Sequence, residues 1–347
     1  MKPNTLFLFM LLFIVASCKK EDDKPSKPKV TDIYLAGSFN SEAAYWKNGE
    51  MVKISSAGQY SALVSIIVQG NDVYTLGRIS HPKGPAFMCW KNGVTIYEED
   101  ASEISYPKDL VVSGNDIYIL ADVAFFNGTY GVYKPTVWKN GLKKELTDGS
   151  QNAGSGSMAL HGNDLYVAGY IQRSNVIRDA ILWKNGNPIQ LSNGKRAEAD
   201  VIAIQGNDVY VAGSGLGSKY NTALVWKNQG VADSLINPNA PYFNTAYVTG
   251  IAVNGKDVYV GATDVNTDSY FNVNMFHYLY WKNGVTLASN SVHADTYTGS
   301  GTACYYNNSL YVAGSLGGTA GYWKDQEAVY IAGQGTSGAS DILIVEH

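Results

Sequence analysis

Two short phrases recur seven times along this chain, and their spacing limits the fold more than any other feature. The first phrase, close to GNDVYVAG, contains a tyrosine that returns every 40 to 50 residues, roughly. The second phrase, WKNG or a close variant, follows each copy of the first and contains all 7 tryptophans of the chain. The repeated residues are Tyr34, Tyr74, Tyr118, Tyr166, Tyr210, Tyr259 and Tyr311, with Trp46, Trp90, Trp138, Trp183, Trp226, Trp281 and Trp323. Such regularity indicates seven copies of one structural unit.

Each repeat has the pattern of four short strands. In the fifth repeat, Val201–Gln205 alternates larger and smaller apolar residues with the period of two that is typical of a strand. The sequence Gly206-Asn207-Asp208 then suits a tight hairpin. The Asn-Gly pair after most Trp-Lys pairs favours a type I′ turn, because both residues tolerate positive φ. A fourth strand such as Val94–Tyr97 follows that turn.

Four antiparallel strands repeated seven times predict an all-β fold, a seven-bladed β-propeller. An α-solenoid and a TIM barrel are excluded because no segment has a helical apolar period, and the repeats of a β-helix are shorter. The first recognisable element, Asp32–Ala36, is a second strand with no first strand before it. The last one, Asp341–Val345, is a first strand with no second after it. We therefore expect the C-terminal strand to complete the first blade and to close the ring.

Residues that recur in every blade are expected to serve the repeat itself. We interpret the repeated Tyr and Trp as packing between blades. The seven lysines after the tryptophans would form a ring near one face, as solvated turn residues or as a contact for an anionic partner. Cys89 and Cys304 lie in non-adjacent repeats, too far apart for a disulfide, and are expected to act as small apolar residues.

The N-terminal segment resembles a bacterial lipoprotein signal. Leu6–Val15 is an apolar run too short to span a bilayer, and Val15-Ala16-Ser17-Cys18 resembles the lipobox. The resemblance implies a signal peptide over residues 1–17 and an acylated Cys18, although an ordinary signal peptide with an incidental cysteine is an alternative. Residues 18–30 are charged and contain prolines, which is typical of a flexible tether to a propeller at 31–347.

Charge and targeting narrow the location and the partners. Three acidic residues after Cys18 resemble the surface-export signal of Bacteroidota lipoproteins: Glu21, Asp22 and Asp23. We expect an outer-membrane lipoprotein exposed at the cell surface, monomeric, and in contact with the membrane only through its lipid anchor. The formal net charge is -4, and no basic cluster with interleaved aromatics follows the tether, so nucleic-acid binding is disfavoured.

The two faces of the expected ring differ in variability. The Gly-Asn-Asp and Lys-Asn-Gly turns share one face, whereas variable loops lie on the other, and variable loops on a rigid scaffold are where binding usually occurs. The richest loops span 124–135 and 264–278. Aromatic rings stack on sugars or anchor protein partners, and arginine supplies forked donors. The alternative is that some of these rings only pack the loops onto the blades. The candidate ligand-binding residues are Phe125, Phe126, Tyr130, Tyr133, Arg173, Arg178, Tyr242, Phe243, Tyr270, Phe271, His277 and Tyr297.

Evidence for a metal is weak. Asp264, Asn266 and Asp268 resemble the start of an EF-hand calcium loop. However, Ser269 and Met275 occupy the positions at which that loop has Gly and Glu. The 5 histidines have no metal-ligand spacing. Apart from this calcium possibility, no cofactor is predicted.

Catalysis has three candidate acids. Glycosidases use paired carboxylates, and Asp109, Asp200 and Asp341 fall near the variable-face start of the strand nearest the axis, at the channel mouth. The corresponding positions of the other repeats are Ser65, Ser157, Gly250 and Thr302, so no acidic ring is evident. Ordinary polarity at the start of a strand is the competing interpretation.

The repeats lack the signatures of WD40, kelch and sialidase Asp-box propellers. They resemble uncharacterised Bacteroidota lipoproteins with WKNG-type repeats, which implies an architecture and no activity. The first hypothesis is a non-enzymatic cell-surface binding lipoprotein whose variable-loop face holds a glycan or an envelope protein. The alternative is a glycoside hydrolase or polysaccharide lyase that uses the acids at the channel mouth. A third possibility is a structural subunit of an outer-membrane complex.

Overall fold

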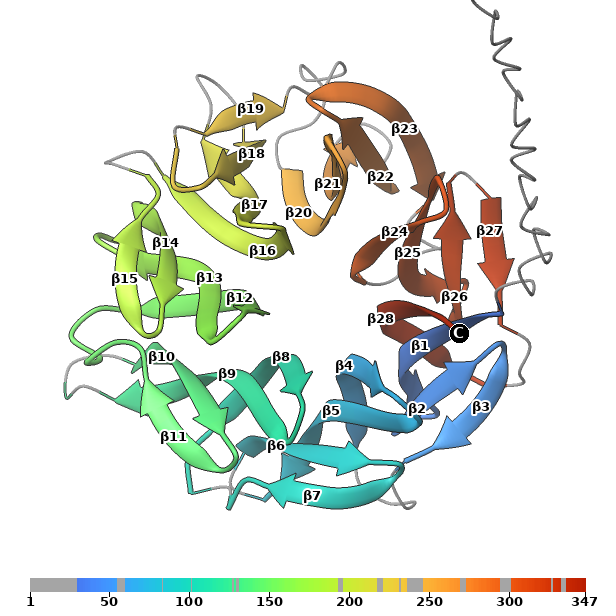
Figure 1. Ribbon diagram of the computed structural model, residues 1–347, viewed down its shortest axis with the longest axis horizontal. Helices are drawn as coiled ribbons and strands as arrows, with labels where there is room; N and C mark the ends of the chain where they lie inside the picture. Colours follow the sequence, from blue (N-terminus) through green and yellow to red (C-terminus); the bar gives the residue numbers. More distant parts are fainter. Residues whose placement is uncertain are drawn as a thin grey trace, which may run out of the picture.

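The computed structural model describes residues 30–347 apart from 55–59, 83, 101, 127, 129–130, 193–195, 217–220, 231, 236–245, 269–272, 294–300, 326 and 332–334. Its strands form seven separate four-stranded antiparallel sheets arranged as blades around a central axis (Figure 1). The predicted seven-bladed β-propeller is confirmed. No described segment forms a helix with the length and apolarity that crossing a bilayer requires.

Each blade runs from an innermost strand at the axis to an outermost strand at the rim. The first blade contains β28 (Ser337–Glu346), β1 (Thr31–Phe39), β2 (Glu42–Lys47) and β3 (Glu50–Lys53). The second contains β4 (Ser61–Gln69), β5 (Asp72–His81), β6 (Gly84–Lys91) and β7 (Val94–Glu98). The third contains β8 (Ser105–Ser113), β9 (Asp116–Phe126), β10 (Gly131–Lys139) and β11 (Leu142–Glu145). The fourth contains β12 (Ala153–His161), β13 (Asp164–Gln172), β14 (Arg178–Lys184) and β15 (Asn187–Gln190).

The remaining three blades follow the same order. The fifth contains β16 (Ala197–Gln205), β17 (Asp208–Leu216), β18 (Asn221–Lys227) and β19 (Asp233–Leu235). The sixth contains β20 (Ala246–Asn254), β21 (Asp257–Asp268), β22 (Val273–Lys282) and β23 (Val285–His293). The seventh contains β24 (Ala303–Tyr306), β25 (Ser309–Leu316), β26 (Thr319–Lys324) and β27 (Glu327–Tyr330).

The two ends of the described chain close the ring, as predicted. β28 pairs with β1 from Thr31 opposite Glu346 to Phe39 opposite Ser337 (Figure 1). The backbones approach so closely here that a Cβ on Gly37 would lie 1.8 Å from the carbonyl oxygen of Gly338. Glycine is therefore required at this point of the closure.

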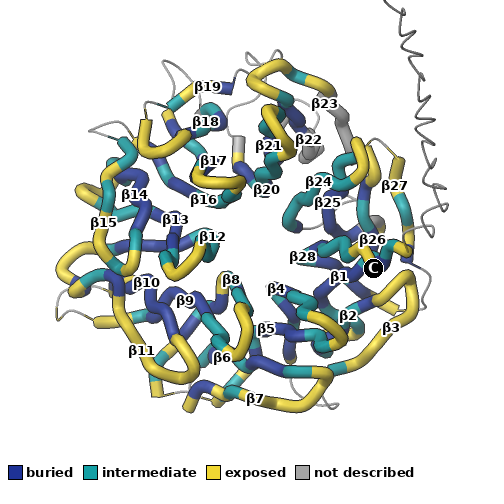
Figure 2. Tube along the Cα trace, viewed as in Figure 1, coloured by how far each residue is buried: buried dark blue, intermediate teal, exposed yellow. Residues whose placement is uncertain are grey.

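The repeated aromatic residues pack between blades, as expected. Tyr34 of the first blade and Trp90 of the second share one buried cluster, and Tyr74 and Trp138 share the next. All seven tryptophans are buried. Burial is greatest in the middle strands of each blade, which are dark blue, and least in the outermost strands, which are mostly yellow (Figure 2). In the described part of the chain the core is therefore a series of six similar apolar clusters between blades, each with a buried tryptophan.

The recurring Asp, Lys and Asn form a polar cluster that joins the two tight turns of each blade. In the first blade, Asn48 has a φ of 50°, its Nδ2 donates to Asp32 Oδ1 at 2.7 Å, and the Ile33 N–H donates to Asn48 Oδ1 at 2.9 Å. Lys47 Nζ lies 2.8 Å from Asp32 Oδ2 and 5.4 Å from the centre of the Tyr34 ring. Both turns consequently lie on one face, as the sequence predicts.

The same cluster accounts for the charge partners of the lysines that follow the tryptophans. In the first six blades the lysine is ion-paired with an aspartate of its own blade, and this ion pair with the Asn hydrogen bond lowers the pKa of that aspartate. The seventh blade has Ser309 and Asp325 at the corresponding positions, and Leu310 N–H donates to Asp325 Oδ1 at 2.9 Å. The turn lysines are solvated, but six of them already have a carboxylate partner.

Candidate functional site

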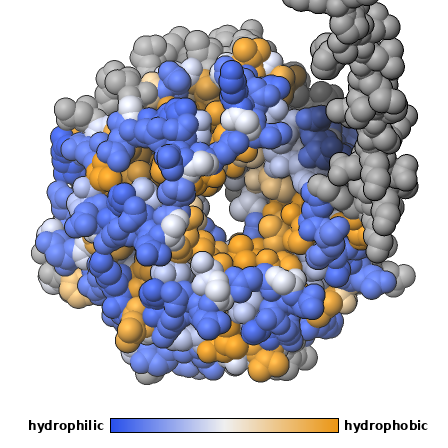
Figure 3. All heavy atoms as spheres, viewed as in Figure 1, coloured by the Kyte–Doolittle hydropathy of each residue, from blue (hydrophilic) through white to orange (hydrophobic). Residues whose placement is uncertain are grey.

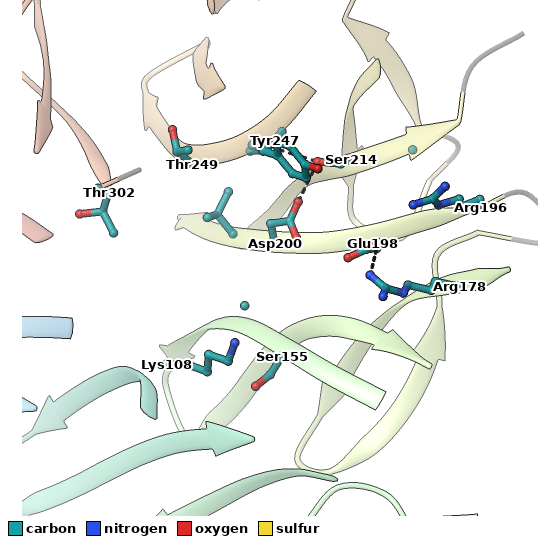
Figure 4. Close-up of a pocket in the computed structure, with 15 residues that line it drawn as sticks. Lys108, Ser155, Arg178, Arg196, Glu198, Asp200, Ser214, Tyr247, Thr249 and Thr302 are labelled. Atoms are coloured by element: carbon teal, nitrogen blue, oxygen red, sulfur yellow. Dashed lines mark hydrogen bonds and ion pairs between the residues drawn. The ribbon is translucent and has the colours of Figure 1, made fainter. Parts of the chain in front are cut away.

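An open channel follows the propeller axis (Figure 3), and a cavity of about 690 Å³ lies on its variable-loop side. Residues from the third to the seventh blade line it. They come from the first halves of innermost strands, from residues just before β16 and β24, and from the adjacent ends of β14 and β17, which places the cavity on the face opposite the tight turns. Its polar lining residues include Lys108, Ser155, Arg178, Arg196, Glu198, Asp200, Ser214, Tyr247, Thr249 and Thr302 (Figure 4). Arg196 and Thr302 lie at opposite ends, with Asp200 between them (Figure 4).

The three cations of the cavity are held differently. Arg178 Nη1 donates to Glu198 Oε1 at 2.7 Å, and its guanidinium also lies 4.5 Å from the centre of the Tyr170 ring. Lys108 Nζ lies 3.3 Å from the buried carboxylate of Asp122. Arg196 is exposed and has no ion pair within the described part of the chain. The cavity therefore has one cation without a bound counter-charge there.

Asp200 is the acid most directly inside the cavity. Its Oδ2 accepts a hydrogen bond from Ser214 Oγ at 3.1 Å, and Ser214 Oγ accepts from the Val248 N–H at 3.3 Å. Removal of water by the surrounding protein, followed by the nearby charge of Glu198, raises the pKa of Asp200 to about 7. Near neutral pH this carboxyl therefore exchanges between its acid and its base form.

The other two acids have a different place. They lie in the middle of their strands, one residue after a backbone bulge, and not at the strand starts as expected. Asp109 Oδ2 accepts from the Met158 N–H of the next blade at 2.8 Å, and Asp341 Oδ2 accepts from the Ile66 N–H of the next blade at 2.9 Å. Neither lines the cavity. The geometry gives Asp109 and Asp341 a role in joining blades.

The bulges also correct the expected equivalence of the three acids. Asp109 pairs with Leu120, two residues after Tyr118, whereas it is Val201 that pairs with the matching Ala212, two residues after Tyr210. Asp200 is therefore one residue earlier in its repeat, at the bulge. The neighbouring strand is close enough that a Cβ on Gly156 would lie 2.0 Å from the Asp200 carbonyl oxygen.

Three predicted aromatic residues are described, and they lie outside the cavity. Phe126 is 67% exposed at the end of β9. Phe125 lies under the ammonium of Lys134, with 4.4 Å between Nζ and the ring centre, and Tyr133 packs edge-on against Tyr106 at 5.6 Å. The expected loop over 124–135 is mostly a hairpin of β9 and β10, and the one over 264–278 is mostly a hairpin of β21 and β22.

The two predicted arginines separate. Arg178 lines the cavity, whereas Arg173 lies apart from it, with Nη2 2.5 Å from Asp179 Oδ2. Asp264, Asn266 and Asp268, expected as the start of a calcium loop, are in strand β21, and their side chains lie outside the described set, as does that of His277. The other predicted residues outside the described part are Cys18, Tyr130, Tyr242, Phe243, Tyr270, Phe271 and Tyr297.

Sequence reasoning missed Lys108, Arg196, Glu198 and Tyr247. A signal for the site exists in the repeat register: the bulge position lies ten residues before the repeated tyrosine, as Asp200 does before Tyr210. In five blades the residue at this position lines the cavity: Lys108, Gly156, Asp200, Thr249 and Gly301. Comparing the repeats column by column at this position would have placed Lys108 and Asp200 in one register.

Comparison with known proteins supports the fold. No family model and no curated protein matches the sequence. Among solved structures, the chain is similar to a puromycin-hydrolyzing peptidase of Mycobacterium tuberculosis, with a TM-score of 0.53 and 10% identity, covering 86% of this chain and 51% of the peptidase. The chain thus spans about half the length of that protein. An acylaminoacyl peptidase of Pyrococcus horikoshii has a TM-score of 0.45 and 11% identity, covering 81% of this chain and 48% of its own. A Bacillus subtilis arabinanase has a TM-score of 0.37 and 12% identity, covering 81% and 92%. At 10% identity, the similarity to the first peptidase concerns the fold alone.

Proposed function

We propose that this chain is a non-enzymatic binding protein that holds a glycan in the cavity at the channel mouth of its variable-loop face. The observation that carries the proposal is the convergence of polar side chains from five blades on one cavity of about 690 Å³. A concave site of this size with a few converging polar groups is typical of small-ligand binding. The side chains are positioned by paired strands, so little ordering is needed when a ligand enters.

Tyr247 gives the cavity an exposed aromatic ring on which a sugar can stack. Its side chain is 54% exposed, although it belongs to the innermost strand β20 and lines the cavity beside Val248 and Thr249. An exposed ring on a rigid strand can cover the apolar face of a sugar, while hydroxyl groups such as those of Thr249 and Thr302 bond with the sugar hydroxyls.

The proposal includes display at the outer surface of a Bacteroidota-type cell through a lipid on Cys18. Its support is the sequence alone: the lipobox resemblance, the acidic residues after Cys18 and the charged tether. The lipid anchor would keep the binding face close to extracellular glycans. Metabolic labelling with a fatty acid, compared between the wild type and Cys18→Ala, tests the anchor independently of binding.

The binding role is tested by a glycan array with the purified protein, followed by calorimetric titration of the glycans that bind. Tyr247→Ala should weaken binding about tenfold, since an aromatic contact contributes about 1 kcal/mol beyond its buried area. Tyr330→Ala is the matched control, because Tyr330 is 63% exposed at the outer rim. Failure of the wild type to bind any glycan, or equal affinity of the wild type and Tyr247→Ala, would refute the glycan role. Capture of an envelope protein instead would favour a structural subunit.

A second candidate, a glycoside hydrolase or polysaccharide lyase, is favoured by one observation. Asp200, with a pKa of about 7, and Glu198, ion-paired with Arg178, lie two residues apart on β16 in the same cavity. Two carboxyl groups in different environments can serve as proton donor and base. For the binding role we expect no new reducing ends and no unsaturated sugars after incubation with a bound glycan. Product formation that falls at least about 100-fold in Asp200→Asn, but not in the exposed control Asp148→Asn, would establish the enzyme instead.

A further inference from the structure

The cavity has a cationic group that no carboxylate in the described part of the chain neutralises. Glu198 neutralises Arg178 at 2.7 Å, and Asp122 neutralises Lys108 at 3.3 Å. Within the described residues, no carboxylate is paired with Arg196, which stands at one end of the cavity (Figure 4). The guanidinium is always charged and presents a planar fork of donors, so a ligand carboxylate fits it with two parallel hydrogen bonds.

The acids of the cavity do not compensate for this charge. The carboxylate of Glu198 is already bound to Arg178. Asp200 accepts the hydroxyl of Ser214 and lies between Arg196 and Thr302 (Figure 4). Burial raises the pKa of Asp200 to about 7, so it carries only part of a negative charge at neutral pH. An anionic group at the Arg196 end is thus attracted by the full positive charge of Arg196 and repelled only by the partial negative charge of Asp200.

The remaining lining fits the rest of a sugar. Tyr247 supplies a ring face, and Ser155, Thr249 and Thr302 supply hydroxyl groups in the same cavity. We propose, on the basis of the glycan-binding role given above, that the ligand is an acidic glycan whose carboxylate is bound by Arg196 while its sugar ring lies against Tyr247. The class meant is a uronic-acid oligosaccharide. A sulfated sugar shares the negative charge, but its sulfate is joined to the ring through an ester oxygen and therefore holds the charge farther from the ring than the carboxylate of a uronic acid does.

The test compares three ligands that differ in the presence and the kind of their acidic group. The purified protein is titrated calorimetrically with trigalacturonate and with its fully methyl-esterified form, which keeps the sugar rings and removes the carboxylates. A sulfated galactan trisaccharide forms the third arm. We expect the free acid to bind at least ten times more tightly than the ester and than the sulfated sugar.

Two variants assign the preference to a residue. Arg196→Gln should weaken binding of trigalacturonate about tenfold and leave binding of the ester unchanged. Lys256→Gln removes the same charge from an exposed position on the tight-turn face, and it should change neither. Equal affinity for acid and ester, equal affinity for the sulfated sugar, or an unchanged Arg196→Gln would overturn the inference while leaving the glycan role intact. If the acid, the ester and every neutral glycan of the array fail to bind, the proposed function itself is wrong.

Discussion

At the scale of single residues, four blades share one contact between neighbouring blades that the acids alone do not reveal. A side chain nine residues before the repeated tyrosine, or its counterpart in β28, accepts a backbone N–H from the next blade. Asp109 and Asp341 do so, and hydroxyl groups do the same elsewhere: the Ile202 N–H donates to Ser157 Oγ at 3.0 Å, and the Ile342 N–H donates to Thr302 Oγ1 at 3.1 Å. Since a hydroxyl can replace the acid, the bond serves the ring and requires no charge.

Ionisation of Asp109 at high pH should therefore lower the free energy of unfolding. Burial raises its pKa to about 7, above the value of about 3.9 in an unfolded chain. The folded state then holds the proton more tightly, so this contribution is complete below pH 4 and is lost as the pH rises through 7. Asp109→Asn cannot ionise. We expect the advantage of the wild type over Asp109→Asn, measured by urea unfolding, to shrink by about 1–2 kcal/mol between pH 5 and pH 8, allowing for contact with channel water.

The exposed acid Glu327 provides the control for that comparison, because Glu327→Gln changes a carboxyl on the outermost strand β27. Its difference from the wild type should stay nearly constant over the same pH range. A difference between the wild type and Asp109→Asn that is constant, or that grows as the pH rises, would show that Asp109 is ionised in the folded state throughout.

At the scale of elements, the sequence predicts strands correctly where both faces of the strand are apolar. It does not predict strand segments that have one face toward the channel. Val201–Gln205 was predicted, but β16 begins at Ala197, because its first half alternates small residues with Glu198 and Asp200. The sequence predicts loops over segments 124–135 and 264–278, since no apolar alternation continues there. They are mostly hairpin ends, and strand pairing needs only backbone hydrogen bonds there.

The site was harder to predict than the fold for a related reason. A blade interface repeats one pattern, so seven tryptophans in one register are enough to reveal it. The cavity combines different residues from five blades, and only ring closure brings Lys108 and Thr302 to the same cavity. In addition, Asp200 lies ten residues before its repeated tyrosine whereas Asp109 lies nine residues before its own, so the two acids occupy neighbouring positions of the repeat.

At the scale of the whole molecule, the ring has seven similar interfaces, and one blade is built from both ends of the described chain. β28 supplies the innermost strand of the first blade, and its Ile342 and Ala339 share a buried cluster with Leu35 and Trp46. Without β28, the first blade would expose the long edge of β1, and the cavity would lose the closed ring that holds its five blades in position.

Deletion of residues 337–347 should therefore abolish cooperative folding. The deletion removes nine residue pairs between β28 and β1 and the apolar contacts of Ile342. This loss is comparable with the whole free energy of unfolding of a domain, which is about 5–15 kcal/mol. We expect no sharp urea transition and a larger hydrodynamic radius, both measured on the purified variant, and partial recovery when a synthetic peptide of residues 337–347 is added. Removal of His347 alone, which breaks its 3.1 Å contact with Asp32 and its backbone hydrogen bond to Val30, should leave the transition in place. A truncated chain that unfolds with the wild-type midpoint would mean that six complete blades hold the ring together without its closing strand.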